Sequence, residues 1–333
     1  MKNLGNIDSR ITAIRSRSDF DALAVEIFRL QAANNPIYRD YLQALGIQAD
    51  AIDSVDAIPF LPISFFKTHR VLTTVGQEKV QAVFRSSTTT GTVPSEHAIL
   101  SLELYKRSLL DSFSFFYGNP SEYCYLALLP SYLERTDSSL VFMVKELMQA
   151  SNHPNSGFFL HDLEALAARL KTNEEAGQKT LLIGVTFALL DLAEQYPMPL
   201  KHTQVLETGG MKGKRRELLR EELHEVLGSA FRLQAVGSEY GMTELLSQAY
   251  APSKGEFHCP PWMRVKVRDT QDPFALLGVG KSGGLNVIDL ANLYSCSFIE
   301  TQDLGRINPN GSFSVLGRFD HSDIRGCNLM AQL

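Results

Sequence analysis

A run of hydroxyl side chains that ends in a glycine is the stretch of this sequence best suited to hold an anion. It comprises Ser86, Ser87, Thr88, Thr89, Thr90 and Gly91, after a strand-like stretch at 80–84 and before a helical pattern that starts near Leu100. Backbone N–H groups and short hydroxyls in such a loop can bind a phosphate. No Gly-Lys-Ser/Thr follows at the spacing of a Walker-type loop. Taken alone, a Ser/Thr-rich run is more often a solvated turn.

A second candidate loop joins a double glycine to a basic cluster. A strand near Gln204–Glu207 leads to Gly209 and Gly210, and Lys212 and Lys214 then precede a helix whose end we expect just before Gly228. Glycines permit close approach of the backbone to a flat or charged ligand. Cations at a helix N-terminus oppose the helix dipole, so a nearby anion would account for them. A tight turn followed by a solvated basic helix start explains the pattern equally well.

A third loop follows a strand expected at 231–236. It carries Glu239, Tyr240, Gly241, Thr243 and Glu244 within the run Gly-Ser-Glu-Tyr-Gly-Met-Thr-Glu. The tyrosine offers a ring for stacking, the threonine a hydroxyl, and the second glutamate a carboxylate suited to Mg²⁺. The alternative is that Thr243 only caps a following helix.

A fourth group lies near the carboxyl end of the chain. Strand-like residues from Ile299 lead through Asp303, and Arg318 follows an Asn-Pro-Asn-Gly turn at 308–311. The Asn-Gly pair between two such runs predicts a β-hairpin. A carboxylate in this position can hold ribose hydroxyls, or it can be an ordinary surface aspartate.

The elements around these loops predict an α/β fold with layered sheets and helices. Residues 8–46 show helical periodicity with a break at Pro36, and the prolines within 58–66 predict an extended segment. Strands expected at 122–129 and 180–185 alternate with helices expected at 105–116, 138–149, 162–170 and 187–195. Such alternation is typical of a mainly parallel sheet, in which ligands bind at the carboxyl ends of strands.

Composition excludes several classes of protein. The chain has 333 residues, 44% of them hydrophobic, and a net charge of -5, which gives no basic field for nucleic acid. The amino-terminal residues lack the apolar run of a signal peptide, and the longest apolar stretch, 181–190, is too short to span a membrane. The four cysteines form no CxxC pair, which predicts a cytoplasmic protein with reduced thiols and neither a zinc site nor disulfides.

The motifs occur together in one known order. The Ser/Thr/Gly loop, the double glycine, Tyr240–Glu244, Asp303–Arg306 and Gly317–Asp320 resemble the adenylate-forming superfamily of acyl-CoA synthetases, phenylacetate-CoA ligases and firefly luciferase. The similarity covers roughly residues 58–328. It implies the large adenylation domain of that superfamily, with a β-hairpin region near its carboxyl end.

The resemblance also implies roles for individual residues. The loop from Ser86 to Gly91 would hold the β- and γ-phosphates of ATP, and Gly209, Gly210, Glu239 and Gly241 would help to form the nucleotide site. Tyr240 would stack on adenine, Thr243 would contact the α-phosphate, and Glu244 would bind Mg²⁺. Asp303 and Arg318 would hold the ribose hydroxyls.

The sequence departs from the superfamily in its phosphate loop and at its carboxyl end. Thr88 stands where relatives usually have glycine, and Pro94 lies near a common lysine, which suggests a looser grip on pyrophosphate. The chain ends at Leu333, so we expect the small C-terminal domain with its catalytic lysine to be lacking. We therefore expect a helical segment at 1–57, an adenylate-forming domain at 58–320 and a tail at 321–333.

This short form resembles the acyl-protein synthetases (LuxE-like) of bacterial fatty-acid reductase complexes. The resemblance implies ATP-dependent activation of a carboxylic acid, with the acyl group then carried on a cysteine near the carboxyl end, here Cys327. Lys212 or Lys214 is our candidate to replace the missing lysine. An acyl reductase is the implied partner protein. Lone cysteines are more often buried apolar filler, and we interpret Cys124 and Cys296 in that way.

Two other functions remain open from the sequence. One is an acyl-CoA ligase of the phenylacetate-CoA ligase type, and the other is a non-catalytic nucleotide- or acyl-binding adenylation domain. The acid itself is not identified by the sequence. Phe187, Leu189 and Leu190 can either line an apolar pocket or belong to the core of a helix.

Overall fold

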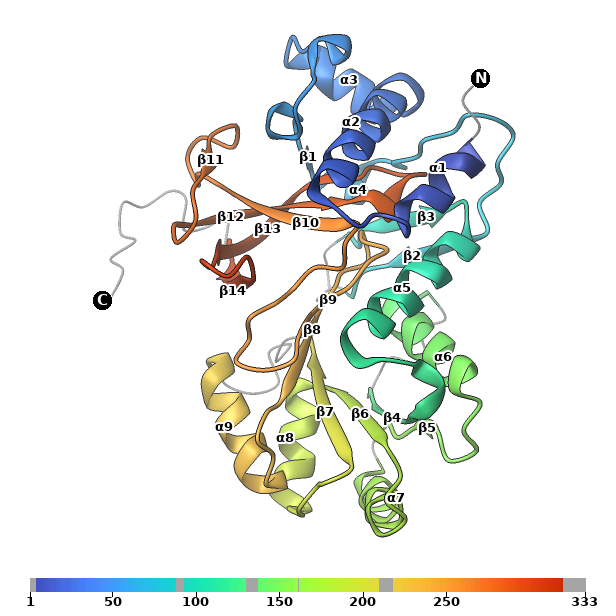
Figure 1. The fold of residues 1–333 in the computed structure, drawn as a ribbon, viewed down its shortest axis with the longest axis vertical. Helices are drawn as coiled ribbons and strands as arrows, with labels where there is room; N and C mark the ends of the chain where they lie inside the picture. The colour runs from blue at the N-terminus through green and yellow to red at the C-terminus, as the bar shows by residue number, and fades with distance from the viewer. Residues whose placement is uncertain (1–3, 88–92, 130–136, 161, 210–217, 320–333) are drawn as a thin grey trace.

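The computed structural model describes residues 4–87, 93–129, 137–160, 162–209 and 218–319. Figure 1 shows two main layers: a sheet under helices α1–α3 in the upper part, and a second sheet flanked by helices in the lower part. The main-chain order of the elements confirms an α/β fold with layered sheets. Within the described ranges, no helix combines the length and hydropathy that crossing a membrane requires.

The helices and strands have the following bounds. The α-helices are α1 Leu4–Ile11, α2 Arg17–Asn34, α3 Pro36–Ala44, α4 Phe65–Thr68, α5 Leu102–Tyr117, α6 Ser139–Ser151, α7 Leu163–Glu175, α8 Thr186–Gln195 and α9 Arg220–Phe231. The strands are β1 Leu61–Pro62, β2 Ala82–Arg85, β3 Glu96–Ile99, β4 Cys124–Leu128, β5 Gly157–Phe158, β6 Thr180–Val185, β7 Thr203–Thr208, β8 Gly237–Tyr240, β9 Ala249–Ala251, β10 Met263–Arg268, β11 Leu276–Leu277, β12 Ser282–Asp289, β13 Phe298–Ile307 and β14 Phe313–Arg318.

The lower sheet has the order β5-β4-β6-β7-β8-β9 and is parallel except for the last pair. Its central strands β4 and β6 are buried at every position, because helices cover both faces of such a sheet. This confirms the mainly parallel sheet expected from the alternating pattern. The carboxyl ends of β7 and β8 lie side by side, at the Thr208–Glu239 pair.

The upper sheet has the order β1-β13-β12-β10-β11, with β14 paired to β13. The β13–β14 pair is antiparallel and joined through the Asn-Gly turn, where Gly311 has a φ of +84°. The left-handed backbone suits glycine, so the predicted hairpin is confirmed. Its register places Asp303 directly opposite Arg318.

The amino-terminal helices pack on this upper sheet. Helix α2 buries the face predicted by its periodicity, with Phe20 and Phe28 in the core. The buried amide of Gln31 donates to the carbonyls of Asn292 and Leu293 and accepts from the Ser297 N–H, at 3.0, 3.1 and 3.0 Å. One side chain thus fixes α2 to the connection between β12 and β13.

Three local predictions are wrong, and one strand was not predicted. The segment 58–66 is extended only to Pro62, because a short helix begins at Phe65, beyond the prolines. The helix expected near Leu100 is α5, and the strand that was not predicted, β3, precedes it. Helix α9 runs through Gly228 to Phe231, and residues 232–236 form no strand. The strand there is instead β8, which contains the Gly-Ser-Glu-Tyr motif itself.

Candidate functional site

Strands β2 and β3, with the Ser86–Ser95 pair beyond them, form what we call the neck of the hydroxyl loop. Strands β2 and β3 pair antiparallel, and beyond them the Ser86 N–H donates to the Ser95 carbonyl at 3.0 Å. The Ser95 N–H in turn donates to the Ser86 hydroxyl at 2.9 Å. Arg85 and Glu96 add an ion pair at 2.7 Å. Ser87 follows this neck, whereas Thr88, Thr89, Thr90 and Gly91 lie outside the described residues.

Glu244 lies against this neck and is buried, with 5% of its surface exposed. Burial raises the pKa of its carboxyl, and a hydrogen bond with the Ser95 side chain acts against that shift. Arg318 and Asp303 are near enough to act on the same carboxyl electrostatically. The structure therefore brings the Glu244 carboxyl, Ser95 at the neck of the hydroxyl loop and the Asp303–Arg318 pair together.

The described donors fit a magnesium–nucleotide complex better than a metal held by protein alone. No cluster of three or more His, Cys, Asp or Glu side chains suited to a metal occurs in the described part of the chain. Mg²⁺ is commonly held by one or two carboxylates together with substrate phosphates. The buried Glu244 carboxyl, which has a hydrogen bond with the Ser95 side chain, supplies one carboxylate of that kind.

Tyr240 links the end of β8 to the β13–β14 hairpin. Its hydroxyl donates to Asp303 Oδ2 at 2.8 Å, and Arg318 Nε donates to Asp303 Oδ1 at 2.9 Å. The Tyr240 ring is 8% exposed and packs against Phe257 and Phe313, with centroids 5.8 and 5.3 Å away. Tyr240, expected near adenine, and Arg318, expected near the ribose, are thus joined through the buried carboxylate of Asp303.

The segment after β8 turns back without forming a helix. Residues 241–248 contain turns and bends up to β9, so the interpretation of Thr243 as a helix cap is wrong. Asp289 accepts from the Leu246 and Ser247 N–H groups, each at 2.9 Å, and Asn292 donates to the Glu244 carbonyl at 2.8 Å. These buried contacts fix the path of the segment that carries Thr243 and Glu244.

The double-glycine turn follows β7 at the same sheet edge. Gly209 has a φ of +74°, and its carbonyl accepts from the Thr186 hydroxyl at 2.7 Å. Beside it, the Thr208 hydroxyl donates to Glu239 Oε2 at 2.5 Å. Burial raises the pKa of Glu239 to about 7. Gly241, next in the motif, has no room for a side chain, because an added Cβ would lie 2.3 Å from Glu239 Oε1.

The basic cluster predicted after this turn is outside the described residues, as are Gly210, Lys212 and Lys214. Where the chain resumes, Arg220 Nε pairs with the buried Glu207 carboxylate at 3.1 Å. Its guanidinium also lies over the Phe257 ring, 4.9 Å from the centroid. Arg220 therefore connects helix α9 to the aromatic group around Tyr240.

The described cysteines have no features of a nucleophile. Cys124 and Cys296 are fully buried, as predicted for core residues, and burial raises the pKa of Cys259 to about 12. A thiol with a raised pKa holds little thiolate at neutral pH. Cys327 lies outside the described residues. Phe187, Leu189 and Leu190 are buried in α8 and belong to the core of the lower layer.

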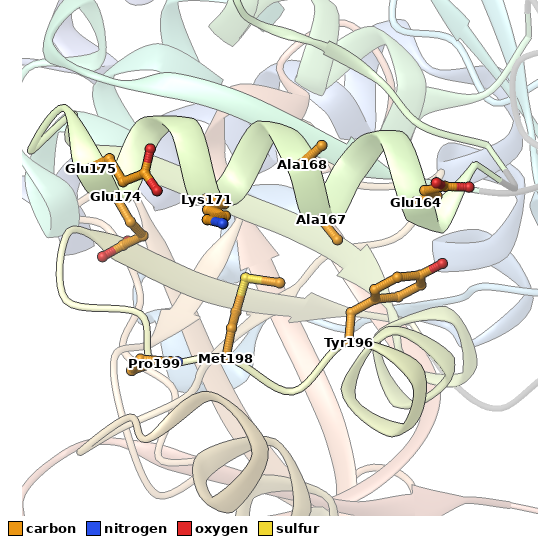
Figure 2. A pocket seen from close by; sticks show the side chains of 9 residues that line it. All are labelled: Glu164, Ala167, Ala168, Lys171, Glu174, Glu175, Tyr196, Met198 and Pro199. Atoms are coloured by element: carbon orange, nitrogen blue, oxygen red, sulfur yellow. The ribbon is translucent and has the colours of Figure 1, made fainter.

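A surface groove of about 520 Å³ lies away from these residues. Figure 2 shows that α7 forms one wall and the connection from α8 to β7, with Tyr196, Met198 and Pro199, forms the other. Both segments lead into the amino ends of strands β6 and β7. The groove therefore runs along α7, and none of the predicted site residues lines it.

Sequence reasoning missed four residues that hold the site together: Ser95, His97, Asp289 and Asn292. Each is a buried polar residue close to apolar positions of a strand or turn. The signal was present in Asp289, which ends the apolar run Leu285-Asn286-Val287-Ile288. A charge at such a position implies a set of hydrogen-bond partners.

Comparison with known proteins finds similarity to one family and to one of its relatives. Residues 16–118 match the model of the family described as acyl-protein synthetase, LuxE. A long-chain-fatty-acid–luciferin-component ligase of Aliivibrio fischeri is 24% identical over 337 residues, which cover 93% of this chain and 86% of the relative.

Solved structures with a similar fold are adenylate-forming enzymes. A 2-hydroxyisobutyryl-CoA ligase in its postadenylation state matches with a TM-score of 0.66 and 13% identity, covering 94% of this chain and 70% of that one. ATP-bound MatB from Rhodopseudomonas palustris matches with a TM-score of 0.57 and 18% identity, over 74% of this chain. The match spans only half (50%) of the MatB chain. The chain is thus similar to the LuxE acyl-protein synthetases over residues 16–118, and its fold is similar to that of adenylate-forming enzymes.

Proposed function

We propose that this protein uses ATP to convert a fatty acid into an acyl-adenylate and then transfers the acyl group to a thiol. The observation that carries the proposal is the convergence of segments from three sheets on Glu244 and Asp303. The neck of the hydroxyl loop bonds to Glu244, and Tyr240 bonds to the Asp303 carboxylate that pairs with Arg318. Polar groups that we consider suited to a divalent cation and to ribose hydroxyls thus lie near one another.

The first step joins the acid to the nucleotide. A carboxylate oxygen of the acid attacks the α-phosphorus of ATP, the bond to the β-phosphate oxygen breaks, and pyrophosphate leaves with the electron pair. Negative charge on the phosphoryl oxygens must be stabilised throughout this displacement. We assign this work to Thr243 at the α-phosphate and to the loop from Ser86 to Gly91 at the departing pyrophosphate.

Mg²⁺ would be held by Glu244 and the phosphates, where it would neutralise part of the phosphate charge. The surroundings of Glu244 support this assignment. When no cation is bound, the buried carboxyl has the nearby positive charge of Arg318 and a hydrogen-bond partner in Ser95. Lys212 and Lys214 remain our candidates for a further cation at the phosphates.

The second step moves the acyl group to sulfur. A thiolate attacks the acyl carbon, the carbon–oxygen bond to AMP breaks, and AMP leaves as a stable anion while a thioester forms. We propose Cys327 as this nucleophile, because the described cysteines are buried or have a raised pKa. The acyl-protein would then pass the group to a partner, for which an acyl reductase is the class we propose.

The fatty acid is proposed from the relative in Aliivibrio fischeri, whose name specifies a long-chain fatty acid. Coenzyme A is the alternative acceptor, since one solved structure of similar fold is a CoA ligase in complex with CoA. The two acceptors predict different products. A self-acylated protein forms without CoA, whereas free acyl-CoA does not.

The test is intact-protein mass spectrometry after incubation with ATP, Mg²⁺ and a series of carboxylic acids. Wild-type protein is compared with Cys327→Ser and with Glu244→Gln, and AMP release and acid-dependent ATP–pyrophosphate exchange are measured in parallel. We expect a hydroxylamine-labile acyl adduct on wild type only, with ATP–pyrophosphate exchange retained in Cys327→Ser and lost in Glu244→Gln. AMP release that depends on CoA, without any adduct, would reject Cys327 as acceptor. No AMP from any acid would reject the proposed function.

A further inference from the structure

His97 is a buried imidazole with a hydrogen-bond partner on each ring nitrogen. It lies on β3, two residues after Ser95, and is 1% exposed. Nδ1 is 2.9 Å from the Thr243 carbonyl oxygen, and Nε2 is 2.8 Å from the Ser295 hydroxyl. A carbonyl oxygen can only accept, so Nδ1 carries the hydrogen and donates it. In the neutral ring, Nε2 then accepts from Ser295.

The Ser295 end of this bridge is fixed by the core. The Ser295 carbonyl accepts from the Asn35 amide at 2.9 Å and from the Thr73 hydroxyl at 2.6 Å. Phe66 packs edge-on to the imidazole, with centroids 5.4 Å apart and planes at 80°. The ring therefore has one defined orientation, set by the upper sheet and the amino-terminal helices.

The Thr243 end is the part of the site that sequence alone associates with the α-phosphate. The residues after Thr243 are anchored to Asp289, the last residue of β12, and to Asn292, on the connection between β12 and β13. His97 adds an anchor from another segment, because it lies on β3, the strand that follows the hydroxyl loop in the chain. Together, Ser95 and His97 join that strand to Glu244 through its carboxyl and to Thr243 through its backbone.

We propose that His97 is a positioning residue that holds the Thr243 backbone at a fixed place relative to the β2–β3 pair. Acting through Thr243, it sets the place of the group that we assign to the α-phosphate. A displacement of about 1 Å in such a site can cost on the order of a hundredfold in rate. This inference rests on the proposed adenylation.

Two substitutions separate the ends of the bridge. His97→Asn places an amide nitrogen near Nδ1 and keeps the donor to Thr243, whereas His97→Gln places its amide near Nε2 and keeps the contact with Ser295. Both remove the ring from the same buried site, so their losses of stability should be similar. His69→Gln, at an exposed histidine, serves as the matched control.

The measurements are acid-dependent ATP–pyrophosphate exchange, resolved into kcat and KM for ATP, and thermal unfolding of each variant. We expect His97→Asn to retain kcat within about threefold of wild type and His97→Gln to lose tenfold or more, at similar unfolding temperatures. Hydrogen exchange of the 241–248 amides should be faster in His97→Gln than in His97→Asn.

Equal kcat values and equal hydrogen exchange in the two variants, with wild type active, would overturn the positioning role. Rates that follow unfolding temperature alone would also overturn it, because the imidazole would then be only structural. Absence of exchange in the wild-type protein with every acid would instead reject the proposed function. In that case the hydrogen-exchange comparison still decides whether His97 holds this segment.

Discussion

Replacing Asp289 by asparagine tests whether one buried carboxylate fixes the segment that carries Glu244. Asp289 is 0% exposed and accepts four hydrogen bonds. Oδ2 accepts from the Leu246 and Ser247 N–H groups, and Oδ1 accepts from the Ser247 hydroxyl and the Ala291 N–H. An asparagine of the same shape has one oxygen and one NH₂ group, so it cannot accept on both sides.

The cost follows from the better of the two amide orientations. With the amide oxygen facing Leu246 and Ser247, the NH₂ group meets the Ser247 hydroxyl, which can rotate to accept, and the Ala291 N–H, which cannot. One buried donor is left without a partner, and this costs about 1–3 kcal/mol. Alanine in place of Asp289 would leave the Ser247 and Ala291 N–H groups without this acceptor, while the Leu246 N–H keeps Asn292 Oδ1 at 3.1 Å, and should cost more.

Urea unfolding of Asp289→Asn, compared with Asp40→Asn at an exposed aspartate, measures this cost. We expect the free energy of unfolding to fall by about 1–3 kcal/mol in the first variant and by less than about 0.5 kcal/mol in the second. A loss below about 0.5 kcal/mol in Asp289→Asn would show that these hydrogen bonds do not hold the segment, and the reasoning would fail.

Three further predictions concern other parts of the site. Burial raises the pKa of Glu239 from 4.5 to about 7. Between these two pH values the folded protein holds a proton on Glu239 that the unfolded protein has lost. The stability of the wild-type protein therefore falls as pH rises through that window. Glu239→Gln should therefore gain up to about 3 kcal/mol over wild type between pH 5 and pH 8, and a pH-independent difference in urea unfolding would contradict this. Tyr240→Phe removes the 2.8 Å hydrogen bond to Asp303 and should lower stability by about 1–2 kcal/mol and raise the KM for ATP; unchanged values of both would separate this pair from the site. Gly305→Ala would place a Cβ 2.4 Å from the Ser314 carbonyl oxygen, so thermal unfolding should show a loss of about 1–3 kcal/mol, and wild-type stability would refute the hairpin register.

The sequence predicts the layers of this fold because hydrophobic periodicity is a local signal. The buried face of α2, the Ser138 cap of α6, the Asp162 cap of α7 and strand β6 all agree with the pattern of their own residues. Caps and apolar faces depend on neighbours three or four positions away.

Contacts between distant segments follow different rules. Strand β3 is short, and its pairing with β2 depends on the loop between them, so the pattern of its own residues did not predict it. His97 and Ser295 are 198 positions apart in the chain and meet because the β2–β3 pair packs against the upper sheet. The motif residues were found by composition and order, whereas the residues that support them required the coordinates.

The last hairpin also fixes the point from which the following residues of the chain start. The Phe319 N–H donates to the Gln302 carbonyl at 2.8 Å, which anchors the chain one residue from both Asp303 and Arg318. Cys327 lies eight positions later in the sequence (327 minus 319), and eight residues span at most about 28 Å when fully extended. Under the proposed function, a thiol so close in the sequence to this anchor competes well with dissolved thiols. Inserting residues between Phe319 and Cys327, rather than changing the cysteine, would then shift acyl transfer toward external acceptors.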